Sequence, residues 1–553
     1  MTSSATAHEL LTELVRAGVA DFVLSPGSRN APLALALAAA EARNEVRLHV
    51  RIDERSAGFL ALGIARGSGR PVAVITTSGT AAVELHPAIV EASHSGIPLI
   101  AVTADRPPLL RGTGANQTID QVQLFGTAVR AFVDIPPDPS DLAALVAIPL
   151  AAALGKAAGP IHLNVCFAPP LVPEPGANAA LPKSAPKPNP SVSSPQLFAA
   201  VMIELGHSTV PAHGLILLGD TCADPSLHSA AITLGTALGW PVLAEAAGGG
   251  PAAGVLPHGP LLLESASWLE DHLPEVLLTV GAFGVSRSVL ELAARVQTHI
   301  AVRRLELPAD PGLSAHLTLD VVPDAPLRPA GGWLAEWRAA AARVAGVVEM
   351  QVAARFSGLT VAAEVWAQAT VQTPFLVGAS WSMRAIAAVA KQRDDAPTLH
   401  CNRGANGIDG LLATAWGIAS GTGLPTTALV GDLAFLYDHN SLLAPDSEAR
   451  PDLLVVVVDN NGGGIFHQLE QGRPEYAEHF ERVFGTAHDL DLTAISSALD
   501  IPTQRVGDRL ALRTALAVAR AAGGVQVVIA DVGSRAGEWA TLQQLRAALD
   551  GSV

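Results

Sequence analysis

The sequence has few cysteines, few charged residues and no long apolar stretch. Its three cysteines, Cys166, Cys222 and Cys401, are far apart and lack metal-binding spacing. This pattern favours a reducing setting over a disulfide framework. No apolar run reaches the roughly 18–20 residues that span a bilayer, and the N-terminus lacks the pattern of a secretory signal. We therefore expect a cytoplasmic protein that does not bind a membrane.

Other absences narrow the chemistry. The net charge of −16 disfavours nucleic acid or an anionic membrane as a partner. No Cys-x-x-Cys or His-x-x-Glu-His metal pattern occurs, and Ser28 and Ser78 have no adjacent His–Asp arrangement that would make them nucleophiles. The middle of the chain lacks both a phosphate-binding P-loop motif and a dinucleotide-binding glycine motif at a strand end. Nucleotide binding therefore has little support there.

The chain is long enough for several domains, and its 49% hydrophobic content indicates well-buried cores. Apolar runs typical of strands alternate with helical patterns, which predicts an α/β fold with doubly wound, mainly parallel sheets. A proline-rich stretch at 181–195 is typical of a linker. We predict domains at residues 1–180, 196–345 and 346–553.

In the first domain, polar loops follow the apolar runs at 21–24, 46–50, 72–75 and 99–102. Loops that follow parallel strands share one edge of a sheet, where ligands bind in open α/β folds. We therefore expect a group of loop residues to lie near one another: Ser28, Arg29, Glu54, Ser78 and Arg106.

A second candidate site lies in the stretch 428–466. Ala428–Val430 and Leu453–Val458 read as buried strands, and polar residues follow each of them. Asp432 follows the first, and Asn460 follows the second beside a run of glycines. These hard oxygen ligands suit Mg²⁺, which usually shares its coordination shell with phosphates. The alternative is an ordinary strand–helix turn followed by an Asn-Gly turn.

Single residues in these loops allow two interpretations. Glu54 opens a helix, where a carboxylate is favourable in any case, but a buried carboxylate there is also suited to acid–base work. Four arginines follow predicted strands: Arg29, Arg106, Arg384 and Arg403. Their fork-shaped guanidinium donors suit carboxylate-rich substrates, although each arginine could instead be structural. Asn116 and Gln117 are neutral donors in the same region or part of a plain loop.

The spacing of Gly431-Asp432-Leu433 and Asn460-Asn461 resembles the Gly-Asp-Gly…Asn-Asn motif of thiamine-diphosphate (ThDP) enzymes, with Leu433 in place of the last glycine. Further motifs are similar to one subfamily, 2-succinyl-5-enolpyruvyl-6-hydroxy-3-cyclohexene-1-carboxylate (SEPHCHC) synthase, the MenD family of menaquinone biosynthesis. They are Ser25-Pro-Gly-Ser-Arg29, Asp53-Glu-Arg55, Thr77-Ser-Gly-Thr80, Thr103-Ala-Asp-Arg-Pro-Pro108, Gly114-Ala-Asn-Gln117, Asn402-Arg-Gly-Ala-Asn-Gly-Ile-Asp-Gly410 and Asp459-Asn-Asn-Gly-Gly-Gly-Ile-Phe466.

The resemblance implies a pyrimidine-binding domain, a central Rossmann-like domain and a diphosphate-binding domain. It also implies a ThDP- and Mg²⁺-dependent transferase (Mn²⁺ can substitute) that decarboxylates 2-oxoglutarate and adds the succinic-semialdehyde carbanion to isochorismate. In such enzymes the site lies between two domains, typically of different subunits. The resemblance therefore implies a homodimer at minimum, and dimers that pair as a homotetramer.

Residue roles are carried over from the same resemblance. Glu54 would exchange a proton with the ThDP pyrimidine, and the metal ligands would be Asp432, Asn460 and the carbonyl of Gly462. Further cofactor contacts would be Ser78, Gly79, Ile408, Gly431, Leu433, Gly463 and Ile465. The substrate region, including the catalytic arginines and amides, would comprise Ser28, Arg29, Arg106, Asn116, Gln117, Arg287, Ser380, Arg384, Arg403, Ile465 and Phe466.

Two alternatives remain open. The chain could be another ThDP carboligase or decarboxylase that acts on pyruvate or glyoxylate, such as an acetohydroxyacid synthase or glyoxylate carboligase relative. It could also be a ThDP-fold regulatory or scaffold subunit that binds ligand without turnover. The presence of Glu54 together with the Asp432 and Asn460 pair argues against the second alternative.

Overall fold

The computed structural model describes residues 2–172, 180–183, 196–221, 224–303, 310–327 and 331–552. Contacts group the chain into two compact units. The first unit contains residues 1–191, 402–423 and 437–451, and the second contains residues 192–401, 424–436 and 452–553. Most of the predicted linker at 181–195 lies outside the described residues. The three domain boundaries remain a prediction.

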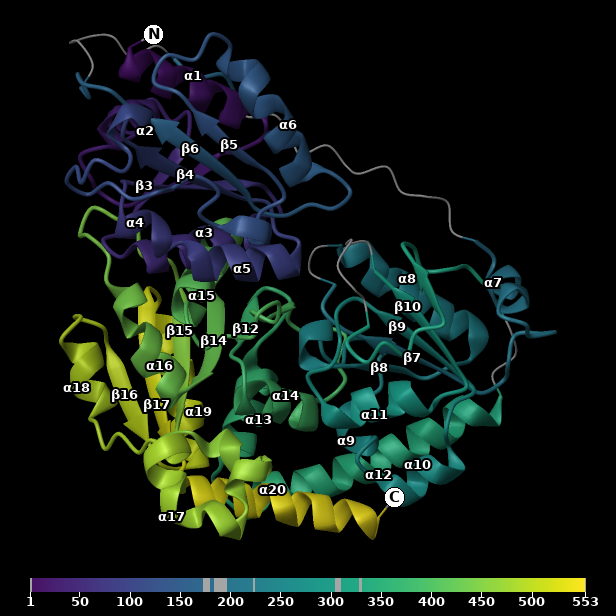
Figure 1. Ribbon diagram of the computed structural model, residues 1–553. Coiled ribbons are helices and arrows are strands. Elements are labelled where there is room, and N and C mark those ends of the chain that lie inside the picture. The colour runs from purple at the N-terminus through teal and green to yellow at the C-terminus, as the bar shows by residue number, and fades with distance from the viewer. Residues whose placement is uncertain are drawn as a thin grey trace. The chain divides into compact units, whose positions relative to one another are not determined.

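The first unit is built on a six-stranded sheet with the order β2-β1-β3-β4-β6-β5, and every pairing between neighbours is parallel. Helices α1 and α6 cover one face of this sheet, and α3 and α5 cover the other (Figure 1). The strands are β1 (Asp21–Leu24), β2 (Arg47–Val50), β3 (Val72–Thr76), β4 (Leu99–Asp105), β5 (Phe132–Ile135) and β6 (Ile161–Cys166). The helices are α1 (Ser3–Arg16), α2 (Ala31–Ala42), α3 (Glu54–Ser68), α4 (Thr80–Val83), α5 (His86–Ser95), α6 (Leu142–Leu154) and α15 (Leu411–Thr422).

Helices α3 and α15 cross very closely because glycines face each other at the contact. A Cβ on Gly63 would lie 2.2 Å from the carbonyl oxygen of Thr414, and a Cβ on Gly417 would lie 2.3 Å from that of Leu60. Any larger side chain at either position would push the helices apart. This packing fixes α3, the helix that begins with Glu54, within the first unit.

The second unit contains two more parallel sheets, with the orders β11-β10-β9-β7-β8 and β13-β12-β14-β15-β17-β16. The strands of the first are β7 (Gly214–Leu218), β8 (Val242–Ala244), β9 (Val276–Val280), β10 (Thr298–Val302) and β11 (Leu317–Leu319). Those of the second are β12 (Phe375–Val377), β13 (Leu399–His400), β14 (Thr426–Gly431), β15 (Leu453–Asp459), β16 (Thr503–Val506) and β17 (Val525–Asp531).

The remaining helices belong mainly to the second unit, whose hydrophobic residues form two separate cores. They are α7 (Phe198–Glu204), α8 (Pro225–Leu238), α9 (Gly259–Leu262), α10 (Ala266–Asp271), α11 (Arg287–Arg295), α12 (Gly332–Ala354), α13 (Gly358–Gln368), α14 (Trp381–Val389), α16 (Asp432–Asp438), α17 (Ala477–Phe480), α18 (Leu492–Ser497), α19 (Arg509–Ala522) and α20 (Arg535–Asp550). The predicted fold class, α/β with three mainly parallel sheets, is confirmed.

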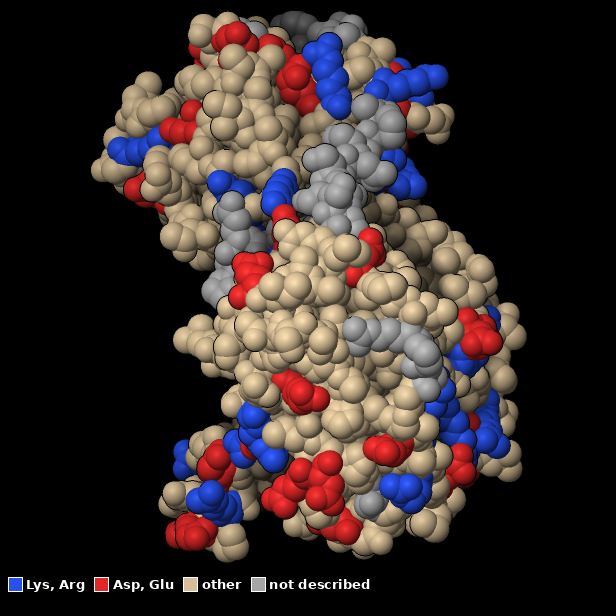
Figure 2. Space-filling view, turned by 90° about the vertical axis from the view of Figure 1, so that its right-hand side faces the viewer, with Lys and Arg blue, Asp and Glu red and all other residues tan. Residues whose placement is uncertain are grey.

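The described surface carries acidic and basic side chains together. Figure 2 shows both interspersed over one face, most of which is formed by uncharged residues. Among the described residues, no helix is both long and apolar enough to cross a membrane. Because the charges of this face are mixed, binding of anionic small molecules would depend on individual arginines in local sites.

Candidate active site

The first unit has a polar cavity of about 730 Å³ at the carboxyl edge of its sheet. It is lined by the loops after β1, β2 and β3, which the sequence predicts to share this edge. Three of the predicted site residues, Ser28, Glu54 and Gln117, lie in its wall. The other lining residues are Pro26, Gly27, Asp53, Arg55, Thr77, Thr80, Ala81, Glu84 and Tyr437.

Glu54 is the first residue of α3, and the start of that helix is fixed by its neighbour. The carboxylate of Asp53 caps the helix and accepts hydrogen bonds from the backbone N–H groups of Arg55 at 2.9 Å and Ser56 at 3.2 Å. Burial raises the pKa of Glu54 above its ordinary value, and the nearby carboxylates of Asp53 and Glu84 add to the rise. A half-buried carboxyl with a raised pKa holds a proton more readily than an exposed one, which suits proton transfer.

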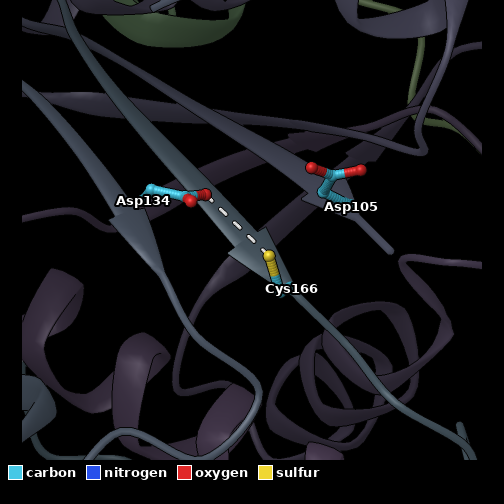
Figure 3. A group of neighbouring side chains, drawn as sticks. All are labelled: Asp105, Asp134 and Cys166. Carbon is cyan, nitrogen blue, oxygen red and sulfur yellow. Dashed lines mark hydrogen bonds between the residues drawn. The ribbon is translucent and has the colours of Figure 1, made fainter. Parts of the chain in front are cut away.

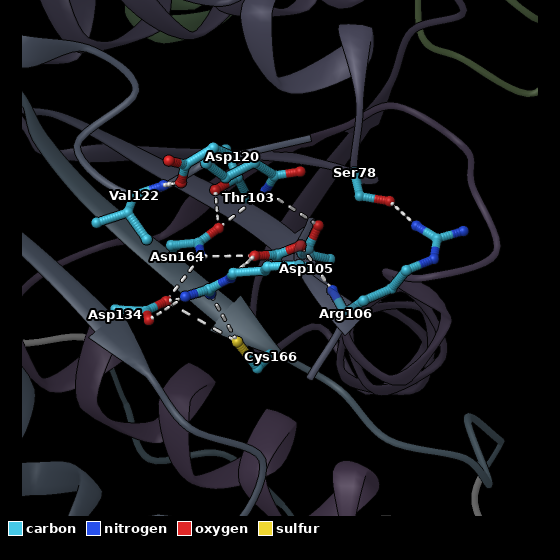
Figure 4. Close-up of polar contacts among 12 residues, drawn as sticks. Ser78, Thr103, Asp105, Arg106, Asp120, Val122, Asp134, Asn164 and Cys166 are labelled. Atoms are coloured by element: carbon cyan, nitrogen blue, oxygen red, sulfur yellow. Dashed lines mark hydrogen bonds and ion pairs between the residues drawn. The ribbon is translucent and has the colours of Figure 1, made fainter. Parts of the chain in front are cut away.

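Arg106, Ser78 and Gln117 form one hydrogen-bonded group beside this cavity. The Arg106 guanidinium donates to Ser78 Oγ at 2.6 Å, as Figure 4 shows, and to the carbonyl oxygen of Gln117 at 2.5 Å. The side-chain amide of Gln117 donates to the carbonyl oxygen of Ser78 at 2.9 Å. The prediction that these loops meet at one edge is thus confirmed at the level of direct contacts.

Arg29 belongs to the same edge. Its guanidinium donates to the carbonyl oxygen of Phe167 at 2.8 Å, and its backbone N–H donates to Thr77 Oγ1 at 3.3 Å. Burial lowers the pKa of Arg29, and the nearby positive charge of Arg106 lowers it further. Two arginines that repel each other beside a polar cavity would both be stabilised by a bound dianion.

Other predicted residues of the first unit lie outside the described lining of this cavity, among them Asn116, Ile408 and Arg403. Asn116 is exposed in the loop after β4, and Ile408 is 36% exposed in the loop before α15. Arg403 lies in that second loop, whose Gly404 and Ala405 N–H groups donate to the buried Glu91 carboxylate at 2.9 and 2.7 Å. Their assignment to cofactor or substrate remains a prediction.

The second unit brings together the three predicted metal ligands. Asp432 follows β14 and is 2% exposed, and its Oδ2 accepts the N–H groups of Asn460 at 3.2 Å and Gly462 at 2.7 Å. Its Oδ1 accepts the N–H of Leu433 at 2.7 Å. The turn after β15 is therefore folded around this one carboxylate, whose orientation is fixed by backbone donors.

The residues present fit a divalent cation. Asn460 Oδ1 is buried, and none of the described groups donates a hydrogen bond to it, so an acceptor oxygen is left for a metal. Gly462 has φ +128°, and a Cβ there would lie 2.2 Å from the Gly485 carbonyl oxygen. Burial raises the pKa of Asp432 in spite of the N–H donors. A bound cation would remove that electrostatic cost.

His488 is a site neighbour that the sequence reasoning missed. Its Nε2 lies 3.4 Å from Asp432 Oδ2 and 3.9 Å from Asp459 Oδ1, so the three side chains form one cluster. No motif signals this histidine, because it is brought in by a loop far along the chain. The backbone N–H of His488 donates to Asn461 Oδ1 at 3.0 Å, which ties that loop to the turn after β15.

Arg384 connects two sheets of the second unit. Its guanidinium donates to the carbonyl oxygens of Ser380 at 2.9 Å and Val285 at 3.0 Å. Glu245, a second residue missed from the sequence, is 1% exposed and accepts the N–H groups of Gly284 and Ser286 at 3.0 and 2.9 Å. Burial lowers the pKa of Arg384, and the Glu245 charge offsets part of this effect.

The remaining predicted residues of the second unit differ in their surroundings. Ser380 precedes α14 with φ +71°, an uncommon conformation for a residue other than glycine. Arg287, the first residue of α11, is 73% exposed and pairs with Glu470 at 3.4 Å. Phe466 packs its ring 5.5 Å from that of Phe484, and Ile465 beside it is partly buried. Gly431 ends β14, and Gly463 donates its N–H to Gly485.

Comparison with known proteins defines the class. Residues 5–124 match the family described as thiamine pyrophosphate enzyme, N-terminal TPP binding domain, and residues 383–530 match the corresponding C-terminal TPP binding domain. An X-ray structure described as a thiamin diphosphate-dependent enzyme from Mycobacterium smegmatis superposes with a TM-score of 0.66, covering 97% of this chain and 99% of that one at 16% identity. The chain therefore has the fold of a thiamine pyrophosphate enzyme.

Curated relatives then define the family. SEPHCHC synthase of Saccharopolyspora erythraea is 40% identical over 95% of each chain. Those of Thermobifida fusca and Kineococcus radiotolerans are 40% and 41% identical over more than nine-tenths of each chain. The chain belongs to the SEPHCHC synthase family of ThDP-dependent enzymes.

Proposed function

We propose that this protein decarboxylates 2-oxoglutarate and adds the remaining four-carbon unit to isochorismate, giving SEPHCHC and CO₂ in menaquinone biosynthesis. The arginines carry this choice of substrates. Arg29 and Arg106 lie at the edge that bears the Glu54 cavity, and Arg384 is largely buried in the second unit. Both proposed substrates are dicarboxylates, and paired guanidinium donors suit them.

Asp432, Asn460 and the carbonyl of Gly462 would hold Mg²⁺, or Mn²⁺ in its place, against the cofactor diphosphate. The buried Asn460 Oδ1 and the fixed Asp432 carboxylate support this assignment. Gly431, Leu433, Gly463 and Ile465 would contact the cofactor beside the metal. When bound, ThDP supplies the electron sink for decarboxylation.

Glu54 would hold and move the proton at the ring nitrogen of the cofactor pyrimidine. Its raised pKa and its position in a polar cavity support that role. Ser78 and Gly79 would line the same pocket, and Ile408 would be an apolar support. A carboxyl group with an ordinary pKa would be ionised throughout the neutral range and would share a proton less readily.

The substrate carboxylates would be bound by Arg29, Arg106, Arg384 and Arg403, with Ser28, Asn116, Gln117 and Ser380 as neutral hydrogen-bonding groups. Arg287, Ile465 and Phe466 would complete the substrate walls. The repulsion between Arg29 and Arg106 supports an anion site at the first edge. Single arginine variants, each tested for a rise in the KM of one substrate, would show which arginine binds which substrate.

We also propose a cytoplasmic homo-oligomer, a dimer at least and a tetramer as the pair of dimers. The buried thiol of Cys166 is of the kind that a reducing compartment preserves. Light scattering coupled to gel filtration would measure the assembly directly. A monomer that retains full turnover would contradict the proposed dimer.

The proposed reaction is tested by CO₂ release from 2-oxoglutarate in the presence of ThDP and Mg²⁺, with and without isochorismate. We expect sustained CO₂ release and a condensed product only when both substrates are present. Pyruvate and glyoxylate serve as comparison donors. Faster turnover of either one than of 2-oxoglutarate would identify a different ThDP carboligase and overturn the substrate assignment.

A further inference from the structure

Three of the proposed substrate residues, Arg106, Asn116 and Gln117, lie on the segment that joins β4 to β5. Within it only the short 3-10 turns Pro108–Leu110 and Gly126–Ala128 are regular. Loop residues near a site are useful only if something fixes them. The polar groups that contact this segment are the candidates for fixing it.

Arg111, in the middle of the segment, connects it to two strands at once. Its guanidinium bonds Asp134 of β5 through Nη1 and Nη2, both at 2.8 Å. It bonds Asp105, the last residue of β4, through Nη2 at 2.9 Å and Nε at 3.2 Å. Asp105 is fully buried and the Arg111 side chain is 19% exposed. Such a doubly bonded fork is stronger and more specific in direction than a single ion pair.

Asn164 of β6 extends this network toward the cavity. Its Nδ2 donates to Asp134 at 2.8 Å and to Asp105 at 3.1 Å, and its Oδ1 accepts from Gln121 Nε2 at 2.8 Å. Gln121 Oε1 in turn accepts the backbone N–H of Gly79 at 3.0 Å. Figure 4 shows Asp134 and Asn164 on one side of Asp105. On the other side, the Arg106 side chain reaches Ser78.

The carboxylates and the thiol of this cluster, Asp105, Asp134 and Cys166, lie close enough together to suggest a metal site (Figure 3). The donors around them favour another interpretation. Arg111 and Asn164 already direct N–H groups at both carboxylates, and burial raises the pKa of the Cys166 thiol to about 12. Burial alone would raise the pKa of Asp134, but the bonds from Arg111 and Asn164 outweigh it and lower that pKa. The guanidinium takes the place that a cation would have.

We propose that Arg111, with Asp105, Asp134, Asn164 and Gln121, is a positioning network that holds Arg106 and Gln117 in the substrate site. It acts through two routes. Arg111 fixes the loop itself, and Gln121 fixes the Ser78-Gly79 backbone that Arg106 and Gln117 contact. The effect of this network on turnover rests on the proposed function. Its anchoring of the loop between β4 and β5 does not.

The test variant is the double substitution R111M/D134N. It removes the guanidinium fork and one carboxylate together, so the cluster keeps its net charge and no extra buried negative charge is created. We expect kcat/KM for 2-oxoglutarate with isochorismate to fall by about tenfold or more, with a smaller loss of calorimetric affinity for ThDP and Mg²⁺ transmitted through Ser78 and Gly79. Hydrogen exchange of the peptide spanning residues 106–121 should become faster. The conservative variant R111K, which reaches one carboxylate at a time, should be intermediate in both measurements.

The matched control is D21N/R47M. Arg47 bonds Asp21 through Nε at 2.6 Å and Nη2 at 2.7 Å, and Asp21 is 2% exposed. Both residues begin their strands, at the edge of the sheet opposite to the cavity. A purely structural ion pair should lower the Tm in this variant while leaving kcat/KM and exchange of the 106–121 peptide at wild-type values.

The outcomes separate the two claims. Wild-type exchange of the 106–121 peptide in R111M/D134N would show that Arg111 does not anchor the loop. Faster exchange with unchanged kcat/KM would show that the anchor has no role in positioning, and either result overturns the proposal. Absence of turnover in the wild-type enzyme would instead contradict the proposed function, while the exchange measurement would still decide the anchoring.

Discussion

The two carboxylates expected to act on the cofactor, Glu54 and Asp432, both lie at the carboxyl edge of a parallel sheet, but they follow different strands of the order and have different surroundings: Glu54 follows the edge strand β2, and Asp432 follows the interior strand β14. Each follows a strand at its carboxyl edge and begins a helix. Glu54 is half-buried in a polar cavity beside two other carboxylates. Asp432 is 2% exposed, and three backbone N–H groups fix both of its oxygens.

This difference matches the tasks proposed for them. A proton-transfer group has to exist in two protonation states, and surroundings that disfavour the charged form make the protonated form more accessible. A metal ligand has to stay ionised in one geometry, and fixed backbone donors provide that geometry. The carboxyl edge of a parallel sheet therefore supports two kinds of chemistry, because the strand that each carboxylate follows and the loops beside it differ.

The largest expected effect comes from Glu54→Gln. The amide keeps the size of the side chain but cannot take up and release the proton, so kcat should fall by about 10²–10⁴-fold. Binding of ThDP and Mg²⁺, measured by calorimetry, should remain within a small factor of wild type. Glu84→Gln is the matched control in the same cavity. Turnover near the wild-type level in E54Q would remove the proton-transfer assignment.

Asp432→Ala should have the opposite pattern. Without the carboxylate, the N–H groups of Asn460 and Gly462 lose their acceptor and the metal loses its charged ligand. We expect calorimetric affinity for ThDP in the presence of Mg²⁺ to fall by about 100-fold or more. E54Q is the natural control, since it leaves these ligands intact. Equal ThDP affinity in D432A and wild type would contradict the metal site.

Arg384→Lys should have a moderate effect. Lysine keeps the charge but cannot donate to the Ser380 and Val285 carbonyls in the same fork. KM for one of the two dicarboxylates should rise by about tenfold, which would also show which substrate Arg384 binds. R393K is the control, because Arg393 pairs with Asp395. Unchanged kinetics in R384K would refute its assignment.

The smallest expected effect concerns stability and is centred on Glu538, at the start of α20. Burial raises its pKa from the ordinary 4.5 to about 7. The stability it contributes is complete below the ordinary pKa and is lost as the pH rises through about 7. E538Q should therefore unfold at a higher Tm than wild type at pH 8, by an amount that corresponds to about 3–4 kcal/mol at most.

At pH 4 to 5 the Tm of E538Q and of wild type should nearly coincide. The exposed Glu478 supplies the control variant E478Q, whose Tm should follow that of wild type at every pH. A Tm difference between E538Q and wild type that does not change with pH would show that the carboxyl group is not the cause.

Apolar runs were sufficient to predict most strands. β1 matches the predicted run at 21–24 at both ends, and β14 and β15 differ from the predicted runs at 428–430 and 453–458 by a few residues. Strand β5 was missed because Phe132–Ile135 is half-exposed and short, and β16 for a similar reason. The helix after β14 begins at Asp432 itself, whose carboxylate accepts the N–H of Leu433, and it gives way to a 3-10 turn at His439–Leu442.

Local sequence motifs also predicted the polar residues that follow the strands. They did not predict the residues that hold those polar residues in place. Asp432, Asn460 and Gly462 share one short stretch, so their contact followed from two adjacent strands. His488, Glu245 and Gln121 reach the groups they contact, each within its own unit, through tertiary folding, and their sequence neighbourhoods contain no distinguishing pattern. The grouping of residues 402–423 with the first sheet depends on the close glycine contact of α3 with α15, which a single sequence does not reveal.

Deuterium exchange at the C2 carbon of bound ThDP, followed by NMR after rapid quenching, tests most directly whether Glu54 transfers the proton while Asp432 serves only to hold the metal and cofactor. The account predicts fast exchange in the wild-type enzyme and slow exchange in E54Q, both measured at saturating ThDP and Mg²⁺. Exchange in E54Q as fast as in wild type, with the cofactor bound equally well, would contradict it.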